Sequence, residues 1–190
     1  MTSRQKYAGA PWLYDETSGD IVGVKDPDGS EFYFARAPRI GSFYDTTDQS
    51  GVANQANAMG FNTTSMSRGV SVVEASKIYV DRNGTYNFQI SVQVFNTDSQ
   101  EHNFDLWWAK NGVNIPESNT RYTAPAKHGA IPGTVVPALN FWVDLLAGDY
   151  IQAMWSSDNA LVRIEYDGPS TSPTRPGIPS IILTVDETSL

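Results

Sequence analysis

Hydrophobic and polar residues alternate most regularly between residues 83 and 112. From Tyr86 to Val94 every second residue is apolar. A period of two is typical of a β-strand with one face in the core and one face outside. The pattern therefore predicts a strand whose outward side chains are polar but uncharged, namely Asn87, Gln89, Ser91 and Gln93.

The chain as a whole is cut into short segments by 15 glycines and 11 prolines. Between them lie runs of β-branched and aromatic residues, and almost no segment has a helical period. This punctuation favours an antiparallel β-sandwich or barrel. The runs predict strands near residues 42–44, 58–62, 70–74, 77–80, 84–96, 103–110, 122–125, 134–145, 150–156 and 162–167.

Three regions are expected along the chain. Residues 1–40 form an N-terminal docking arm with a β-hairpin, whose strands Ile21–Val24 and Glu31–Ala35 flank the turn sequence Pro27-Asp28-Gly29. Residues 41–167 form the main domain. Residues 168–190 form a Pro-rich linker and a C-terminal strand, "SIILTV", that is expected to pair with its own subunit or a neighbour.

Composition narrows the possible partners. Charged residues make up 18% of the chain and the formal net charge is -8, with lysines and arginines scattered singly. Nucleic-acid binding needs a basic patch, so we expect no nucleic-acid partner. The chain has no cysteine for disulfides or thiolate metal sites. It has no apolar run of spanning length and no N-terminal apolar segment, so we expect neither membrane insertion nor a signal peptide.

Few residues suggest chemistry. His102 and His128 lie apart in the sequence, without the further ligands that a zinc site requires. Asp98, Glu101 and Asp105 cluster near a predicted strand connection. They could act as paired glycosidase carboxylates or bind calcium, but hairpin tips are normally acidic and solvated, and this explains them better. We therefore predict no catalytic, cofactor-binding or metal-ligating residue, and no enzymatic activity.

Trp107 and Trp108 are adjacent, so in a strand they face opposite sides. Trp108 shares its parity with Phe104 and Leu106 and is expected in the core. Trp107 then points outward, where it could anchor an interface, stack on a sugar, or be covered by a second sheet or subunit. An uncharged polar face meets another polar surface without charge desolvation. We therefore predict a subunit interface formed by Asn87, Gln89, Ser91, Gln93 and Trp107.

Three stretches resemble the tumour-necrosis-factor-like jelly roll of the complement globular heads. They are the strand Gly84–Phe88, the hairpin segment Leu106–Gly112, and the strand entry Leu145–Tyr150. The resemblance covers about residues 42–167 and implies an antiparallel jelly-roll β-sandwich and a threefold assembly. The expected fold is therefore an all-β jelly roll with an N-terminal β-hairpin arm and a C-terminal extended tail.

Other segments resemble uncharacterised virion proteins of tailed bacteriophages. These are "FNTDSQEHNFDLWWAKNG" and "PAKHGAIPGTVVPALNFWVDLLAGDYIQAMWSS", together with Ser18–Val24 followed by Pro27-Asp28-Gly29. The resemblance implies a homotrimeric structural protein of the virion, assembled in the host cytoplasm, with other tail or capsid proteins and a possible host-surface receptor as partners. We predict a tail fibre or fibre-tip protein; a capsid decoration protein is the alternative, and a cellular carbohydrate-binding module is a further alternative.

Docking to the particle is assigned to the N-terminal arm. A two-stranded hairpin is marginally stable alone, so the arm must pack against a partner. Main-chain hydrogen bonds and apolar anchors would attach it. The predicted docking residues are Trp12, Leu13, Ile21, Val22, Phe32 and Phe34.

Overall fold

The computed structural model describes residues 12–14, 21–33 and 37–188, and every regular element in them is a β-strand. No helix in this part of the chain is long and apolar enough to cross a membrane. The chain divides into two compact units between Ala37 and Pro38.

The N-terminal unit contains a three-stranded antiparallel sheet, not the two-stranded hairpin expected. Strands β2 (Ile21–Lys25) and β3 (Glu31–Tyr33) form the predicted hairpin, and β1 (Trp12–Tyr14) pairs with the free side of β2. The hairpin turn has Gly29 at φ +93°, a conformation that glycine adopts without steric cost. The third strand was missed because three residues are too few to show a period.

The second unit is built from antiparallel strands. They are β4 (Ile40–Asp45), β5 (Asn57–Ala58), β6 (Thr63–Arg68), β7 (Val70–Val73), β8 (Lys77–Val80), β9 (Gly84–Val92), β10 (Val94–Asn96), β11 (His102–Lys110), β12 (Val113–Asn114), β13 (Thr120–Ala124), β14 (Gly133–Val135), β15 (Ala138–Leu145), β16 (Tyr150–Ser157), β17 (Val162–Ile164), β18 (Ser170–Thr171), β19 (Thr174–Arg175) and β20 (Ile181–Glu187).

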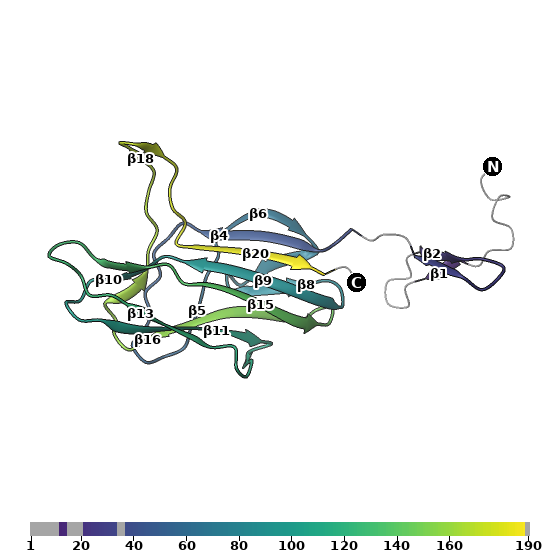
Figure 1. The fold of residues 1–190 in the computed structure, drawn as a ribbon, viewed down its shortest axis with the longest axis horizontal. Coiled ribbons are helices and arrows are strands. Elements are labelled where there is room, and N and C mark those ends of the chain that lie inside the picture. The colour runs from purple at the N-terminus through teal and green to yellow at the C-terminus, as the bar shows by residue number, and fades with distance from the viewer. Residues whose placement is uncertain (1–11, 15–20, 34–36, 189–190) are drawn as a thin grey trace. The chain divides into compact units, whose positions relative to one another are not determined.

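Two large sheets form the layers of this unit (Figure 1). One has the strand order β15-β9-β20-β4-β6 and is called the β9 sheet here. The other has the order β12-β11-β16-β8-β7, with β13 also paired to β11 and β5 to β16; it is called the β11 sheet. A smaller sheet, β14-β10-β17, and the hairpin β18-β19 complete the unit. All registers are antiparallel, the arrangement of a β-sandwich.

Pairing between the main strands is nested. The first strand β4 pairs with the last strand β20, β8 pairs with β16, β9 with β15, and β11 with β13. Each inner pair lies within the sequence span of the pair outside it. The two further ladders β20–β9 and β16–β11 join these pairs into the two sheets.

The core lies between the sheets and confirms the predicted alternation. Tyr86, Phe88, Ile90 and Val92 of β9 are all buried. Trp108 is fully buried, as its parity predicted, with ring centroids 5.5 Å from Phe88 and 6.1 Å from Phe141. Phe104 stacks on Trp155 in the same cluster, at 5.5 Å. Aromatic packing of this kind adds to the free energy of burial.

The expected domain boundary at residue 167 is wrong. β20 is a central strand that lies between β9 and β4, and its Ile181, Leu183 and Val185 are buried in the core. The compact unit runs to Thr188. The Pro-rich segment 168–179, expected as a linker, contains the hairpin β18–β19, which projects from the sandwich (Figure 1). The C-terminal segment is therefore an integral strand and not a tail.

Candidate functional site

The outer face of the β9 sheet carries three rows of side chains that run across its strands. Residues directly opposite one another in a ladder point to the same side of the sheet. The rows are Ala138–Ser91–Ile182–Tyr44, Asn140–Gln89–Thr184–Ser42–Met66, and Trp142–Asn87–Asp186–Ile40–Arg68. We call these residues the β9 face. Only Asp186 and Arg68 among them are charged, and both lie in the third row.

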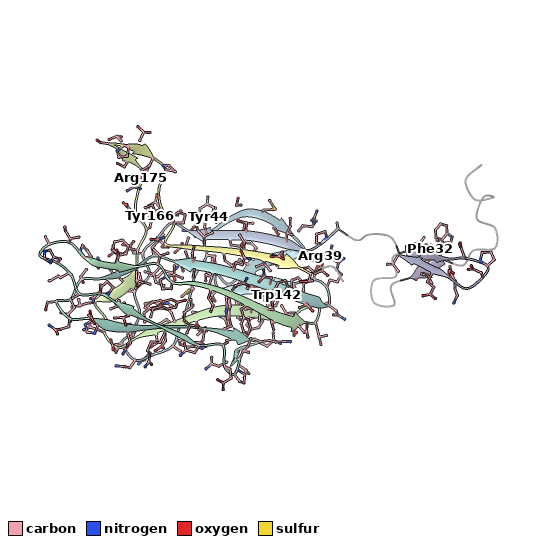
Figure 2. The ribbon with its side chains drawn as sticks, in the orientation of Figure 1. Phe32, Arg39, Tyr44, Trp142, Tyr166 and Arg175 are labelled. Carbon is pink, nitrogen blue, oxygen red and sulfur yellow. The ribbon has the colours of Figure 1, made fainter. Side chains whose placement is uncertain are left out.

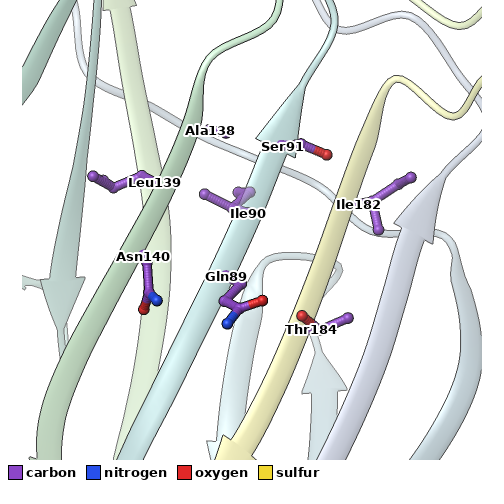
Figure 3. A pocket seen from close by; sticks show the side chains of 8 residues that line it. All are labelled: Gln89, Ile90, Ser91, Ala138, Leu139, Asn140, Ile182 and Thr184. Atoms are coloured by element: carbon purple, nitrogen blue, oxygen red, sulfur yellow. The ribbon is translucent and has the colours of Figure 1, made fainter.

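A shallow depression of about 380 Å³ lies over the first two rows (Figure 3). Its outward side chains are the uncharged Gln89, Ser91, Asn140 and Thr184, with Ala138 and Ile182 beside them. Ile90 and Leu139 complete its lining. The amides and hydroxyls can donate and accept hydrogen bonds, whereas no carboxylate, imidazole or amine in this lining could serve acid–base chemistry. The depression is thus suited to binding and not to proton transfer.

Asn87 lies in the third row between Trp142 of β15 and Asp186 of β20. Asn87 is 4% exposed, so the expectation of an exposed Asn87 is wrong, although its ladder partners place it in a row of outward side chains. Its Nδ2 donates to Asp186 Oδ1 at 3.4 Å, and its buried Oδ1 has no partner among the described residues. An unpaired buried acceptor costs about 1–3 kcal/mol.

Large apolar side chains lie exposed on the same face. Trp142 and Met66 are each 52% exposed, and Ile182 is 40% exposed. Figure 2 labels Trp142 on the β9 sheet. Sequence reasoning missed all three, although the alternation along residues 138–145 could have revealed Trp142 as outward-facing. Exposed tryptophan and methionine next to uncharged polar groups are typical of binding surfaces.

The other predicted interface residues do not all belong to the β9 face. Gln89 and Ser91 lie on it, but Gln93 falls in the break between β9 and β10, where its backbone bonds Ser180 and Glu165. Trp107 lies on β11, in the other sheet, with its Nε1 donating to Asn114 Oδ1 at 2.8 Å. The predicted set is therefore divided between two sheets and cannot form one continuous patch.

His102 lies between two carboxylates that sequence spacing did not bring together. Its Nε2 is 2.8 Å from Asp98 Oδ2, and its Nδ1 is 3.0 Å from Asp158 Oδ1. The hydrogen bond to His102, followed by that from the Ser99 backbone, lowers the pKa of Asp98. Both ring nitrogens of His102 therefore lie within hydrogen-bonding distance of a carboxylate oxygen. The cluster joins the loops after β10 and β16.

The three acidic residues expected as one cluster have separate environments. Asp98 contacts His102, whereas Asp105 accepts two hydrogen bonds from Arg121, each of 3.0 Å. Glu101 is exposed. Within the described residues no group of three or more His, Asp or Glu side chains is placed to hold a metal ion. His128 forms a two-residue backbone bridge with Ile131 at an exposed turn.

Two of the motif segments noted in the sequence meet at one end of the sandwich. Asp149 Oδ2 accepts from Lys110 Nζ at 2.8 Å and from the Leu146 backbone N–H at 2.8 Å, while Oδ1 accepts from Asn111 Nδ2 at 2.7 Å. The Tyr150 backbone N–H donates to Asn111 Oδ1 at 2.9 Å. These contacts lower the pKa of Asp149 to about 2, with the Lys110 hydrogen bond as the largest cause. The motif residues are therefore structural: they hold two turns together.

Replacing Asp149 with Asn is expected to lower the free energy of unfolding by about 2 kcal/mol at pH 7, because bonds to a charged group are lost. A carboxyl whose pKa is depressed in the folded state stabilises the protein above its ordinary pKa of 3.8 and loses that effect as the pH falls through about 2. The difference between wild type and variant, measured by urea unfolding, should therefore shrink between pH 4 and pH 2. Asp167→Asn, at an exposed ion pair, is the control; an equal effect there would refute this role for Asp149.

The predicted docking residues share one small sheet but not one face. Trp12, Val24 and Phe32 stand opposite one another across β1, β2 and β3, so they form a single row. Val22 has the parity of Val24, whereas Leu13 stands opposite Gly23 on the other side. The exposed fractions of Trp12, Ile21 and Phe32 are 40%, 48% and 54%. Phe34 lies outside the described residues.

The sequence matches no protein-family model and no curated protein. Among the features described, the β9 face combines the largest set of uncharged outward side chains with exposed aromatic and aliphatic residues. It is therefore the candidate functional site.

Proposed function

We propose that this chain is a non-enzymatic structural protein of a tailed-phage virion. Its sandwich would be a jelly-roll head that self-associates as a homotrimer through the β9 face, and its N-terminal unit would dock onto other virion proteins. The β9 face, in which Asp186 and Arg68 are the two charged members, is the observation that carries the proposal, because a face with so few charges can be buried at a small desolvation cost.

The nested strand pairing supports the jelly-roll assignment. A jelly roll arises when a long antiparallel ribbon winds around a core, so that its strands pair first with last and inner with inner. The pairs β4–β20, β8–β16, β9–β15 and β11–β13 follow this order. The resemblance of residues 42–167 to tumour-necrosis-factor-like heads then favours a threefold assembly.

The separate N-terminal unit supports docking as its role. A three-stranded sheet with Trp12 and Phe32 exposed on one face has an apolar row that a partner could cover. A tail fibre or fibre tip is our first choice of position, since the head would then be displayed. A capsid decoration protein is the alternative. Labelling intact particles with an antibody against the head distinguishes them: label at the tail supports the fibre, and label over the capsid supports decoration.

Self-association is expected at micromolar concentration. Sedimentation of the purified protein should give a mass near three times the 20.8 kDa of one chain. Gln89 is exposed on β9, directly beside Asn140 of the edge strand β15, so Gln89→Arg would place a charge in the proposed contact. We expect that variant to sediment as a folded monomer, because a buried unpaired charge costs several kcal/mol.

Thr123→Arg provides the matched control. Thr123 is an exposed strand residue of β13, in the β11 sheet, so its variant should keep the wild-type mass. A wild-type protein that remains monomeric at micromolar concentration would refute the self-association.

A second candidate function, binding of a neutral carbohydrate, is favoured by one observation. The depression lined by Gln89, Asn140 and Thr184 lies one row from the exposed Trp142, and sugars bind to planar aromatic rings beside amide and hydroxyl groups. In this function the β9 face would stay open in a monomer. A glycan array probed with the wild-type, Trp142→Ala and Thr123→Arg proteins tests it: saturable binding by a monomeric wild-type protein that is lost on Trp142→Ala and kept in Thr123→Arg would support this candidate over self-association.

A further inference from the structure

The two edge strands of the β9 sheet, β15 and β6, carry opposite charges on the side of the β9 face. On the β15 edge, Trp142 is followed two residues later by the exposed Asp144, which points to the same side. On the β6 edge, Met66 is followed two residues later by the exposed Arg68. Trp142 and Arg68 belong to the same row, so both charged residues lie toward the same end of the strands.

We propose that the β15 edge of one copy packs on the β6 edge of the next copy. This inference rests on the proposed self-association through the β9 face and specifies which parts of that face meet. Trp142 of one copy would cover Met66 and the aliphatic part of Arg68 in its neighbour. The Arg68 guanidinium would pair with the neighbour's Asp144 carboxylate.

The chemistry of the two edges is complementary. A tryptophan ring packs favourably on a methionine thioether and on a guanidinium plane. Each charged group is already held near its edge: Arg68 Nε donates to the Pro38 carbonyl at 2.8 Å, and Asp144 Oδ1 accepts from Thr85 Oγ1 at 2.6 Å. Side chains that are partly ordered before association lose less conformational entropy on binding.

The contact is heterologous, because each copy uses two different edges. A heterologous contact generates a ring when its rotation closes and a filament when it does not. Closure after three copies gives the proposed homotrimer, in which every Trp142 and every Met66 is covered. The charge placed at each edge then disfavours pairing of like edges.

Charge reversal tests the pairing of Arg68 with Asp144. Arg68→Glu and Asp144→Arg should each weaken the trimer about tenfold, measured as the concentration for half-assembly in sedimentation. The double variant Arg68→Glu/Asp144→Arg should recover to within about threefold of wild type, since the opposite charges face each other again. Arg68→Gln, which removes the charge without reversing it, should give an intermediate loss.

Lys127→Glu is the control, because it reverses a charge on an exposed loop far in sequence from both edges. It should leave assembly unchanged, and circular dichroism and thermal unfolding should show that all variants stay folded. If wild type forms trimers but the single reversals do not weaken them, or the double variant does not recover, the edge-to-edge contact is wrong while the self-association stands. If the wild-type protein does not associate at all, both the edge-to-edge contact and the proposed self-association are wrong.

Discussion

Truncation of the chain after Pro179 is expected to abolish folding of the sandwich, although it removes only the last strand. β20 lies between β9 and β4, so its loss would expose both neighbouring strands and separate β4 and β6 from the sheet. Ile181, Leu183 and Val185 are buried, and truncating one buried aliphatic side chain alone costs about 2–5 kcal/mol. Three such losses, about 6–15 kcal/mol together, are comparable with the about 5–15 kcal/mol that stabilises a typical domain.

Polar contacts at both ends of β20 would be lost as well. The Ser180 N–H and hydroxyl both donate to the Asp45 carbonyl, at 2.9 Å and 3.2 Å. Glu187 forms an ion pair with Arg82 and accepts from the Arg39 backbone N–H at 2.9 Å. These contacts connect both ends of β20 to β4 and to the residue that precedes it, Arg39.

Circular dichroism and urea unfolding measure the effect of the truncation. We expect the truncated chain to be insoluble, or to lack a cooperative unfolding transition. Leu183→Ala should lower the free energy of unfolding by about 3 kcal/mol, whereas Ile182→Ala, at an outward position of the same strand, should cost less than about 1 kcal/mol. Both are best compared in the Gln89→Arg background, so that association does not contribute. A truncated protein that still unfolds cooperatively would contradict the central position of β20.

Local pattern was sufficient to predict the strands whose two faces differ. Along β9 and β11 a buried side chain follows an outward one, so the alternation predicted the buried positions of Phe88 and Trp108. β6 lacked this signal. It lies at the edge of its sheet, and Thr64 to Arg68 are all exposed, so its sequence has no apolar face to detect.

Pairings between distant segments could not be predicted in this way. β20 pairs with β4 across more than a hundred residues, and no local pattern specifies the partner of an apolar strand. The same reason explains the candidate site. The buried Asn87 lies between Trp142 and Asp186, which come from two other strands, and His102 contacts Asp158 from a different loop. Sequence spacing predicts which way a side chain points, but not what covers it.

Deleting residues 1–37 is expected to leave a folded head that no longer enters virions. The division of the chain between Ala37 and Pro38 leaves every strand of the sandwich in the remaining fragment. The fragment also keeps Arg39, which bonds Glu187, and its ion pair with Asp81. We therefore expect its thermal unfolding temperature to stay within a few degrees of that of the full-length protein.

The loss of incorporation follows from the proposed docking role of the N-terminal unit. Complementing a phage that lacks the gene with the truncated protein should give particles without the head, detected by immunoblotting of purified virions. Phe32→Glu should also reduce incorporation, because Phe32 is 54% exposed and a charge would disrupt the apolar row that it forms with Trp12 and Val24. Val52→Glu is the control, since Val52 is 58% exposed but belongs to the sandwich. If the truncated head incorporates as well as the full-length protein, the N-terminal unit is not the anchor, and the surface of the sandwich must dock instead.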